Sequence, residues 1–247
     1  MPIRTDTIAL EYNRQWKELD DFILFNPGAR HRRRWILREL DRIPFFKLLD
    51  AGCGNGELLI AIKRHMPSAK GMSGVDISSH VIEQNKIRLP EVNFQVLDLE
   101  NQSLEETFDV IVCSEVIEHL ENRRIAFRNL SSMLVPTGTL LLTSPTGHIY
   151  TTEKHFGHIT HPNLQEIAEL AIENGFRIMK TRNWGFPFYN FTKWATNLNS
   201  DWAIKNFASG RYSLSSKIVS HLCYFGNFLN LPSSAQGCQL FIRLQKL

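Results

Sequence analysis

Short apolar runs alternate with helix-length amphipathic segments through the middle of the 247-residue chain. The apolar runs have the length and the side chains that are typical of strands. They lie at 46–50, 69–76, 92–98, 108–114 and 139–144. Helices are expected between them, at about 56–65, 79–88 and 121–134. Because strands that alternate with helices pair in parallel, this pattern predicts an α/β fold with a doubly wound, mainly parallel sheet.

Both ends of the chain depart from this alternation. Residues 1–45 are rich in charged and aromatic side chains, which predicts helices that cover one edge of the sheet. A loop is expected at 145–161 and a helix at 162–173. Two further strands, at 175–179 and 237–244, complete a predicted sheet of seven strands.

An aromatic-rich stretch lies before the last predicted strand, at 185–232. It is too long for a plain connection, so we expect a helical insertion or lid. The chain is therefore predicted to have three parts. Residues 1–45 form an N-terminal helical cover, residues 46–184 and 233–247 together form the core, and residues 185–232 form this insertion.

A glycine-rich turn follows the first predicted strand. It reads Asp50-Ala51-Gly52-Cys53-Gly54-Asn55-Gly56 and leads into a helix-like run. Glycines remove side chains where a backbone bends and approaches a ligand, and the next helix points its free N–H groups at that ligand. The turn therefore predicts a nucleotide-like cofactor at the carboxyl end of the strand. Its G-x-G-x-G spacing differs from the G-x-G-x-x-G of dinucleotide-binding loops.

This spacing, with an acid before the first glycine, resembles motif I of class I S-adenosylmethionine (SAM) methyltransferases, and the resemblance extends over about 46–145. It implies a Rossmann-like methyltransferase fold. It also implies that SAM is the cofactor and that the glycine loop packs against its methionine part. The implied cofactor-binding residues are the loop's Asp50, Gly52, Gly54 and Gly56, then Asp76 and Ile77 for the ribose, Asp98 and Leu99 for the adenine, and Ser114 beside the methionine part.

A closer resemblance is to the ubiquinone-biosynthesis O-methyltransferases. That family carries an Asn-Pro-x-Arg segment before motif I and an E-x-x-E-H segment after the fourth strand. Here Asn26-Pro27 precedes Arg32, with extra residues between them. The family's arginine binds the SAM carboxylate, and a guanidinium suits that bidentate contact. The resemblance implies this role for Arg32, with Arg30 or Arg33 as alternatives because the local spacing departs from the family.

The E-x-x-E-H segment is Glu115-Val116-Ile117-Glu118-His119. If it is helical, its two carboxylates and its imidazole share one face and can ligate Mg²⁺ or Mn²⁺. The segment also resembles the small-RNA 3′-terminal 2′-O-methyltransferases, which pair it with a downstream H-x-x-H. That resemblance implies a further ligand at His158 or His155. In metal-free relatives the histidine orders the site or acts as a base.

Other histidines of the same region are expected to be ordinary loop residues, namely His148 and His161. His119 and His158 are the candidate catalytic residues, as base or as ligands. The candidate metal ligands are Glu115, Glu118, His119 and His158.

Composition indicates which partners and which cellular compartment to expect for this protein. The net charge is only +3, which argues against a nucleic-acid partner. No apolar run approaches the roughly 18 residues of a membrane span, and the first residues lack an apolar signal core. The four cysteines form no CxxC pair, which predicts reduced thiols in a cytoplasmic protein.

The predicted function is SAM-dependent transfer of a methyl group to a hydroxyl of a small-molecule acceptor in a biosynthetic pathway. The aromatic insertion at 185–232 is expected to form the acceptor pocket. The alternatives are a metal-dependent RNA 3′-terminal 2′-O-methyltransferase, a C- or N-methyltransferase acting on a small molecule, and a SAM-binding protein without turnover.

Overall fold

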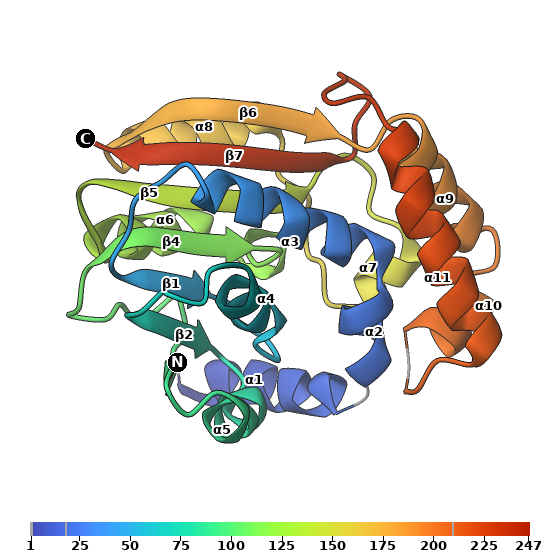
Figure 1. The fold of residues 1–247 in the computed structure, drawn as a ribbon, viewed down its shortest axis with the longest axis horizontal. Helices are drawn as coiled ribbons and strands as arrows, with labels where there is room; N and C mark the ends of the chain where they lie inside the picture. The colour runs from blue at the N-terminus through green and yellow to red at the C-terminus, as the bar shows by residue number, and fades with distance from the viewer. Residues whose placement is uncertain (1, 18, 209) are drawn as a thin grey trace.

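The computed structural model describes residues 2–17, 19–208 and 210–247, which form an open sheet between two layers of helices (Figure 1). The strands, from one edge to the other, are β3 (Asn93–Val96), β2 (Met72–Asp76), β1 (Leu48–Ala51), β4 (Phe108–Ser114), β5 (Leu134–Pro145), β7 (Gln239–Lys246) and β6 (Phe176–Trp184). Strands β1 to β5 pair in parallel, and β7 runs antiparallel to both β5 and β6. The predicted seven-stranded, mainly parallel sheet is confirmed.

The central strands are buried on both faces, as the apolar run at 108–114 predicts. Successive side chains of a strand point to opposite faces. Ile111 and Cys113 therefore enter one hydrophobic core, while Val110 and Val112 enter the other. Two cores, one on each face, hold the sheet rigidly and fix where the ends of its strands lie.

Helices connect the parallel strands and cover both faces of the sheet (Figure 1). They are α4 (Glu57–His65), α5 (Ser79–Arg88), α6 (Arg123–Ser132) and α8 (Leu164–Glu173). Local capping explains where three of them begin. Side-chain oxygens of Ser78, Asn122 and Asn163 accept hydrogen bonds from the first turns of α5, α6 and α8.

The N-terminal segment forms α1 (Pro2–Trp16), α2 (Asp20–Phe25) and α3 (Pro27–Leu40). Helix α3 crosses the sheet, and Asn26 caps it by accepting a hydrogen bond from the Ala29 N–H. Its end is held to the sheet because Glu39, which is buried, pairs with Lys180 of β6 and Arg243 of β7.

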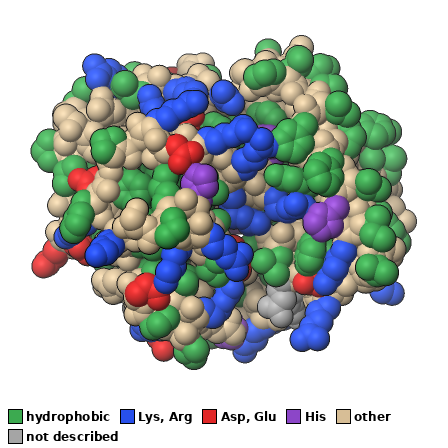
Figure 2. All heavy atoms as spheres, in the orientation of Figure 1, with side chains coloured by type: hydrophobic (Ala, Val, Ile, Leu, Met, Phe, Trp, Pro, Cys, Tyr) green, Lys and Arg blue, Asp and Glu red, His purple; other side chains and the backbone are tan. Residues whose placement is uncertain are grey.

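Three helices form within the stretch predicted as an insertion. They are α9 (Phe188–Asn197), α10 (Ser200–Phe207) and α11 (Leu214–Gly226), followed by the 3₁₀ helix η2 (Asn227–Leu229). They stack beside the carboxyl ends of the parallel strands, at the right of Figure 1, and α11 packs on α3. Hydrophobic side chains gather over these helices at the right of Figure 2.

Some predicted boundaries are wrong. Strand β5 begins at Leu134 rather than 139, because Thr137 takes a left-handed backbone (φ +63°) and the chain passes through the expected turn as an irregular strand. The segment 145–161, predicted as a loop, contains the short helix α7 (Thr151–His155). No helix in the described ranges has both the length and the apolar character that crossing a membrane requires.

Candidate functional site

A cavity of about 490 Å³ lies at the carboxyl ends of β1 and β4. The glycine loop and the tip of β4 form one wall, and the inner faces of α9, α10 and α11 form the opposite wall. Helices α2 and α3 contribute the side between them. Open α/β sheets bind ligands at this edge, so the fold itself places the cavity where a cofactor is expected.

The glycine loop takes a conformation that needs glycine. Gly52, Gly54 and Gly56 all have positive φ, at 82°, 48° and 77°. A Cβ on Gly52 would lie 2.2 Å from Cγ2 of Val116, and one on Gly54 would lie 2.4 Å from the Trp16 ring. Gly52 and Gly54 also line the cavity. The cofactor role of the three glycines stays a prediction.

Asp50 lies at the base of the loop and lines the cavity. Burial, reinforced by the negative charge of Asp76, raises the pKa of Asp50 to about 8. The carboxyl group is therefore largely protonated near neutral pH. A protonated carboxyl can donate a hydrogen bond as well as accept one.

Asp76 ties the end of β2 to the glycine loop. Its Oδ2 accepts a hydrogen bond from the Gly54 N–H at 2.9 Å, and its Oδ1 accepts one from the Ser78 N–H at 2.9 Å. The side chain is only 8% exposed, and burial raises its pKa against the effect of these hydrogen bonds. Asp76 thus orients the loop directly, in addition to any contact with a ribose.

Helix α1 covers the side of the site on which Asp76 lies. Asn13 Oδ1 accepts hydrogen bonds from Ser78 Oγ at 2.6 Å and from the His80 N–H at 3.1 Å. The Trp16 ring packs directly against Gly54. In this structure α1 therefore lies over the region that the resemblance assigns to the adenosine.

The four residues predicted to contact the ribose and the adenine do not line the cavity. They are Asp76, Ile77, Asp98 and Leu99. Asp98 accepts hydrogen bonds from the Glu100 N–H at 2.9 Å and from Asn101 Nδ2 at 2.6 Å. Leu99 is 5% exposed and packs in the core. The cofactor assignments of these residues stay predictions.

Arg32 and Glu115 both line the cavity and form an ion pair. Arg32 Nη1 lies 3.3 Å from Glu115 Oε2, and the arginine side chain is 15% exposed. Glu115 Oε1 also accepts hydrogen bonds from Gln239 at 2.7 Å and from Thr143 at 3.1 Å. Ser114, which also lines the cavity, bonds to Thr143 at 2.8 Å.

The two alternative arginines are engaged elsewhere. Arg30 stacks on the Tyr224 ring, with its guanidinium carbon 3.7 Å from the ring centroid. Arg33 donates to the Ile23 carbonyl at 3.0 Å, and burial lowers its pKa to about 10. Among these three arginines, Arg32 has the guanidinium placed beside a carboxylate at the strand tips.

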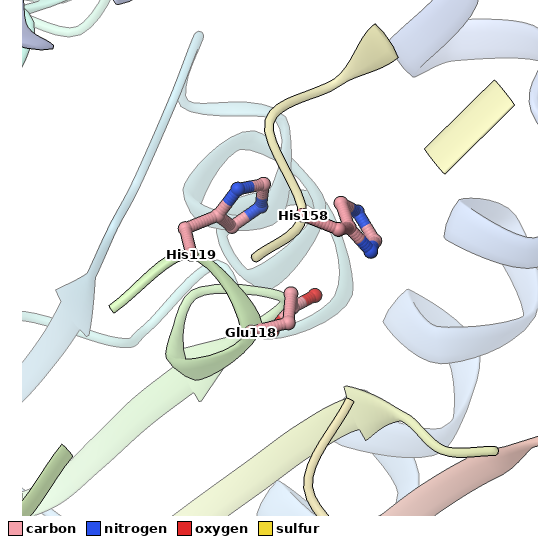
Figure 3. Close-up of side chains that lie close together, drawn as sticks. All are labelled: Glu118, His119 and His158. Carbon is pink, nitrogen blue, oxygen red and sulfur yellow. The ribbon is translucent and has the colours of Figure 1, made fainter. Parts of the chain in front are cut away.

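The second half of the E-x-x-E-H segment meets the downstream histidines. Figure 3 shows Glu118, His119 and His158 converging, and one ligand atom from each lies within 4.8 Å of the others. His119 Nδ1 lies 3.2 Å from the Gly157 carbonyl, so Nδ1 carries the proton and Nε2 is left as an acceptor. Burial lowers the pKa of His119, which keeps its ring neutral near pH 7.

Glu118 is fully buried beside these histidines. One of its oxygens accepts a hydrogen bond from Ser144 Oγ at 3.3 Å, whereas the other has no partner among the described residues. Burial, followed by the charge of Glu115, raises the pKa of Glu118 well above its usual range. An unpartnered buried oxygen next to two imidazoles has the chemistry of a divalent-cation site.

Glu115 does not join this group. The segment is helical only from Ile117, as a 3₁₀ turn (Ile117–His119), and Glu115 has a left-handed backbone with φ +59°. The condition under which Glu115, Glu118 and His119 would share one helical face is therefore not met. The left-handed residue turns the Glu115 carboxylate toward Arg32 instead.

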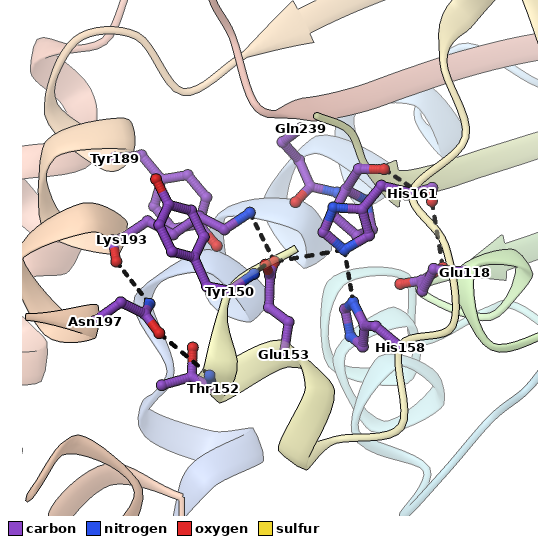
Figure 4. A network of polar contacts seen from close by, with 12 residues as sticks. Glu118, Tyr150, Thr152, Glu153, His158, His161, Tyr189, Lys193, Asn197 and Gln239 are labelled. Atoms are coloured by element: carbon purple, nitrogen blue, oxygen red, sulfur yellow. Dashed lines mark hydrogen bonds and ion pairs between the residues drawn. The ribbon is translucent and has the colours of Figure 1, made fainter. Parts of the chain in front are cut away.

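A polar network continues from His158 away from the strands (Figure 4). His158 Nδ1 lies 2.9 Å from His161 Nε2, and Lys193 Nζ of α9 lies 2.6 Å from Glu153 Oε1. His161 is 3.7 Å from the same carboxylate oxygen. Burial is the main cause that lowers the pKa of His158 to about 2 and that of His161 to about 4. The rings are therefore neutral.

Sequence reasoning missed part of this network. His161 was expected to be an ordinary loop histidine, yet its side chain is fully buried against His158. The i, i+3 spacing of the two histidines is the signal that could have found it. Glu153 and Lys193 lie 40 residues apart in sequence and carry no local signal. His155, the other candidate ligand, is exposed and lies outside the group.

Comparison with known proteins identifies the fold and its class. A family model described as a methyltransferase domain matches residues 10–181. Trans-aconitate 2-methyltransferase of Escherichia coli is 28% identical over 143 residues, covering 57% of this chain and 53% of that protein. The chain thus aligns with about half the length of this curated relative.

Two solved structures are similar over most of their length. The N-methyltransferase NodS from Bradyrhizobium japonicum, in complex with S-adenosyl-L-homocysteine, has a TM-score of 0.60 at 19% identity, covering 96% of this chain and 97% of that chain. A putative sarcosine dimethylglycine methyltransferase from Galdieria sulphuraria has a TM-score of 0.61 at 15% identity, covering 88% and 85%.

These similarities confirm the predicted Rossmann-like methyltransferase fold. The closer resemblance to the ubiquinone-biosynthesis enzymes stays a prediction. Because the family model matches well over half of the sequence, the chain belongs to the methyltransferase-domain family.

Proposed function

We propose that this chain transfers the methyl group of SAM to a hydroxyl of a mainly apolar small molecule. The observation that carries the proposal is His119, a neutral imidazole that lines the cavity. Its Nδ1–H is engaged by the Gly157 carbonyl, so Nε2 can accept a proton. The opposite wall carries Trp202, Phe207 and Tyr212, which suit an apolar or aromatic acceptor.

The chemistry needs alignment more than it needs reactive groups. The sulfonium already activates the methyl group, so the acceptor oxygen, the methyl carbon and the sulfur must lie in line. The new O–CH₃ bond forms as the S–CH₃ bond breaks, leaving S-adenosylhomocysteine. The hydroxyl proton passes to His119 Nε2, which makes the oxygen a better nucleophile in the transition state.

Methyl transfer with radiolabelled SAM tests this proposal, using matched phenols, alcohols, amines and carboxylic acids as acceptors. His119→Asn should lower turnover of the hydroxyl acceptor about a hundredfold or more and leave SAM affinity unchanged by calorimetry. His155→Asn, at an exposed histidine outside the group, is the matched control. Transfer to amines only would contradict the choice of acceptor. Full turnover in His119→Asn would contradict the choice of base.

A metal-assisted form of the same reaction is the second candidate, favoured by the unpartnered oxygen of Glu118. Glu118, His119 and His158 would hold Mg²⁺ or Mn²⁺. Such a cation would supply Lewis acidity that favours the ionised acceptor oxygen. In that case the two histidines act as ligands and neither is the base.

Direct metal binding distinguishes the two forms. Calorimetry with Mn²⁺ should show one site that Glu118→Gln weakens at least tenfold, and EDTA should stop turnover until Mn²⁺ is restored. Glu153→Gln is a useful comparison, because Glu153 belongs to a second cluster with His158 and His161. If EDTA does not change turnover and calorimetry shows no heat of Mn²⁺ binding, the metal-free form of the reaction is the one supported.

A further inference from the structure

Helix α11 has its polar and apolar faces reversed. Two of its serines point inward, Ser216 and Ser220, which are only 6% and 3% exposed. Its large apolar residues point outward at helical spacing. They are Leu214, Ile218, Leu222 and Phe225, between 52% and 77% exposed. A helix on a water-covered surface normally shows the opposite arrangement, so this face is built for an apolar environment.

The exposed apolar surface extends over the neighbouring helices. More than half of the large hydrophobic side chains exposed in the described residues lie between 186 and 231. Those outside α11's stripe are Phe186, Phe191, Trp194, Leu198, Trp202, Val219, Phe228, Leu229 and Leu231. We call this surface, together with the stripe on α11, the apolar face. It is visible at the right of Figure 2.

Basic side chains lie within and beside the apolar face. Residues 185–232 contain four lysines and arginines and a single acid, Asp201. Of the basic residues, Lys193 lines the cavity and pairs with Glu153, Lys217 pairs with Asp21, and Arg211 is exposed. From α3, Arg30 stacks on Tyr224 and Arg34 lies 4.4 Å from the centre of the Phe228 ring. Aromatic and basic side chains with almost no acids suit the headgroup region of an anionic bilayer, where rings and cations lie at the interface.

The apolar face is continuous with the cavity. Trp202 and Val219 line the cavity and also count among the exposed hydrophobic side chains, at 54% and 44%. Cys223 of α11 also lines the cavity. Helices α10 and α11 therefore contribute side chains both to the cavity lining and to the apolar face.

We propose that the apolar face docks onto the surface of an anionic lipid bilayer. Helices α9 to α11 lie in the interface, the large apolar side chains insert among the acyl chains, and the basic side chains meet the phosphates. The cavity then opens beside the membrane, where apolar acceptors accumulate. The docking itself does not depend on methyl transfer.

Co-sedimentation with phosphatidylcholine vesicles, with and without phosphatidylglycerol, tests the proposal. The full chain should bind the anionic vesicles more tightly. The double variant Ile218→Glu/Leu222→Glu should bind them at least tenfold more weakly. Ile87→Glu/Ile172→Glu adds the same charges at exposed apolar positions on α5 and α8, 83% and 69% exposed, and should bind as the unmodified chain does.

Two measurements keep this result interpretable. Calorimetry with SAM shows that each variant keeps its folded cofactor site, independently of any acceptor. Sedimentation velocity shows whether the apolar face instead joins two copies of the chain. The proposal is overturned if the chain binds neither kind of vesicle, or if the α11 variant binds anionic vesicles as tightly as the unmodified chain. It is also overturned if the unmodified chain is a dimer that does not bind vesicles and the α11 variant is a monomer.

Discussion

At the scale of single residues, the cofactor side of the site depends on a few atoms at the ends of strands. Asp76 joins two backbone N–H groups with one carboxylate, and Gly52 leaves no space for a side chain beside Val116. Neither residue contributes much apolar burial. Their effects should therefore appear in SAM binding and in the local geometry of the loop.

Asp76→Ala should abolish measurable SAM binding in calorimetry. The substitution removes the predicted ribose ligand and leaves the Gly54 and Ser78 N–H groups without their acceptor, at about 1–3 kcal/mol each. Asp109→Ala is the matched control, because Asp109 also accepts two backbone hydrogen bonds, from Phe46 and Lys47 at 2.8 Å, at the opposite end of the sheet. The control should lose stability but keep SAM affinity. Equal affinity in both variants would refute the role of Asp76.

Gly52→Ala should cost more stability than Gly175→Ala. Both glycines have a positive φ, at 82° and 76°, so both substitutions carry about 1–2 kcal/mol of backbone strain. A Cβ on Gly175 would meet nothing within 4 Å, whereas one on Gly52 would meet Val116. Urea unfolding should show about 1–3 kcal/mol of additional loss for Gly52→Ala. Equal losses would mean that Val116 moves aside freely.

At the scale of elements, α3 decides how the cavity is closed because it carries Arg32 and supports α11. It is held to the antiparallel edge of the sheet by Glu39, which is 2% exposed and lies beside three cations. His31 adds a second attachment, with its ring stacked on Trp184 of β6 at 4.0 Å between centroids.

Glu39→Gln should destabilise the protein by about 2 kcal/mol, because it leaves Lys180 and Arg243 without their counter-charge. This loss is smaller than that from breaking a fully buried pair, since both cations are partly solvated. Glu83→Gln, in the exposed pair with Lys86, should change stability by less than about 0.5 kcal/mol. Chemical denaturation measures both. A loss no larger than that of Glu83→Gln would show that Glu39 does not anchor α3.

At the scale of the whole molecule, folding buries several histidines in their neutral form. Burial, followed by neighbouring arginines, lowers the pKa of His31 from 6.5 to about 4. Below pH 6.5 the unfolded chain takes up a proton there that the folded protein does not. Folding stability from this group is therefore present above pH 6.5 and is lost as the pH falls toward about 4.

His31→Phe should remove this dependence while keeping a ring to stack on Trp184. Between about pH 6.5 and 4, the free energy of unfolding should fall less steeply in the variant, by up to about 1.4 kcal/mol per pH unit. Between about pH 7 and 8 the two slopes should agree, because His31 is neutral in both states. Urea unfolding across this range checks the prediction. Parallel curves at all pH values would contradict a buried neutral His31.

Sequence by itself determined the sheet, the position of the cofactor loop and the carboxyl edge at which the cavity lies. These follow from local signals: the alternation of apolar runs and helices, the Asp50–Gly56 turn, and caps such as Ser78. Each acts over a few residues, where hydrogen bonds and backbone sterics are nearly independent of the rest of the chain.

Tertiary structure alone decided which side chains meet. It brought His161, Glu153 and Lys193 close to His158, and it paired Glu115 with Arg32 so that Glu115 does not join Glu118. It also placed α1 over Asp76 and turned the large apolar side chains of α11 outward. These outcomes depend on packing between segments far apart in sequence and on one left-handed residue, Glu115. No short stretch of sequence contains that information, because burial and charge at each position are set by its distant neighbours.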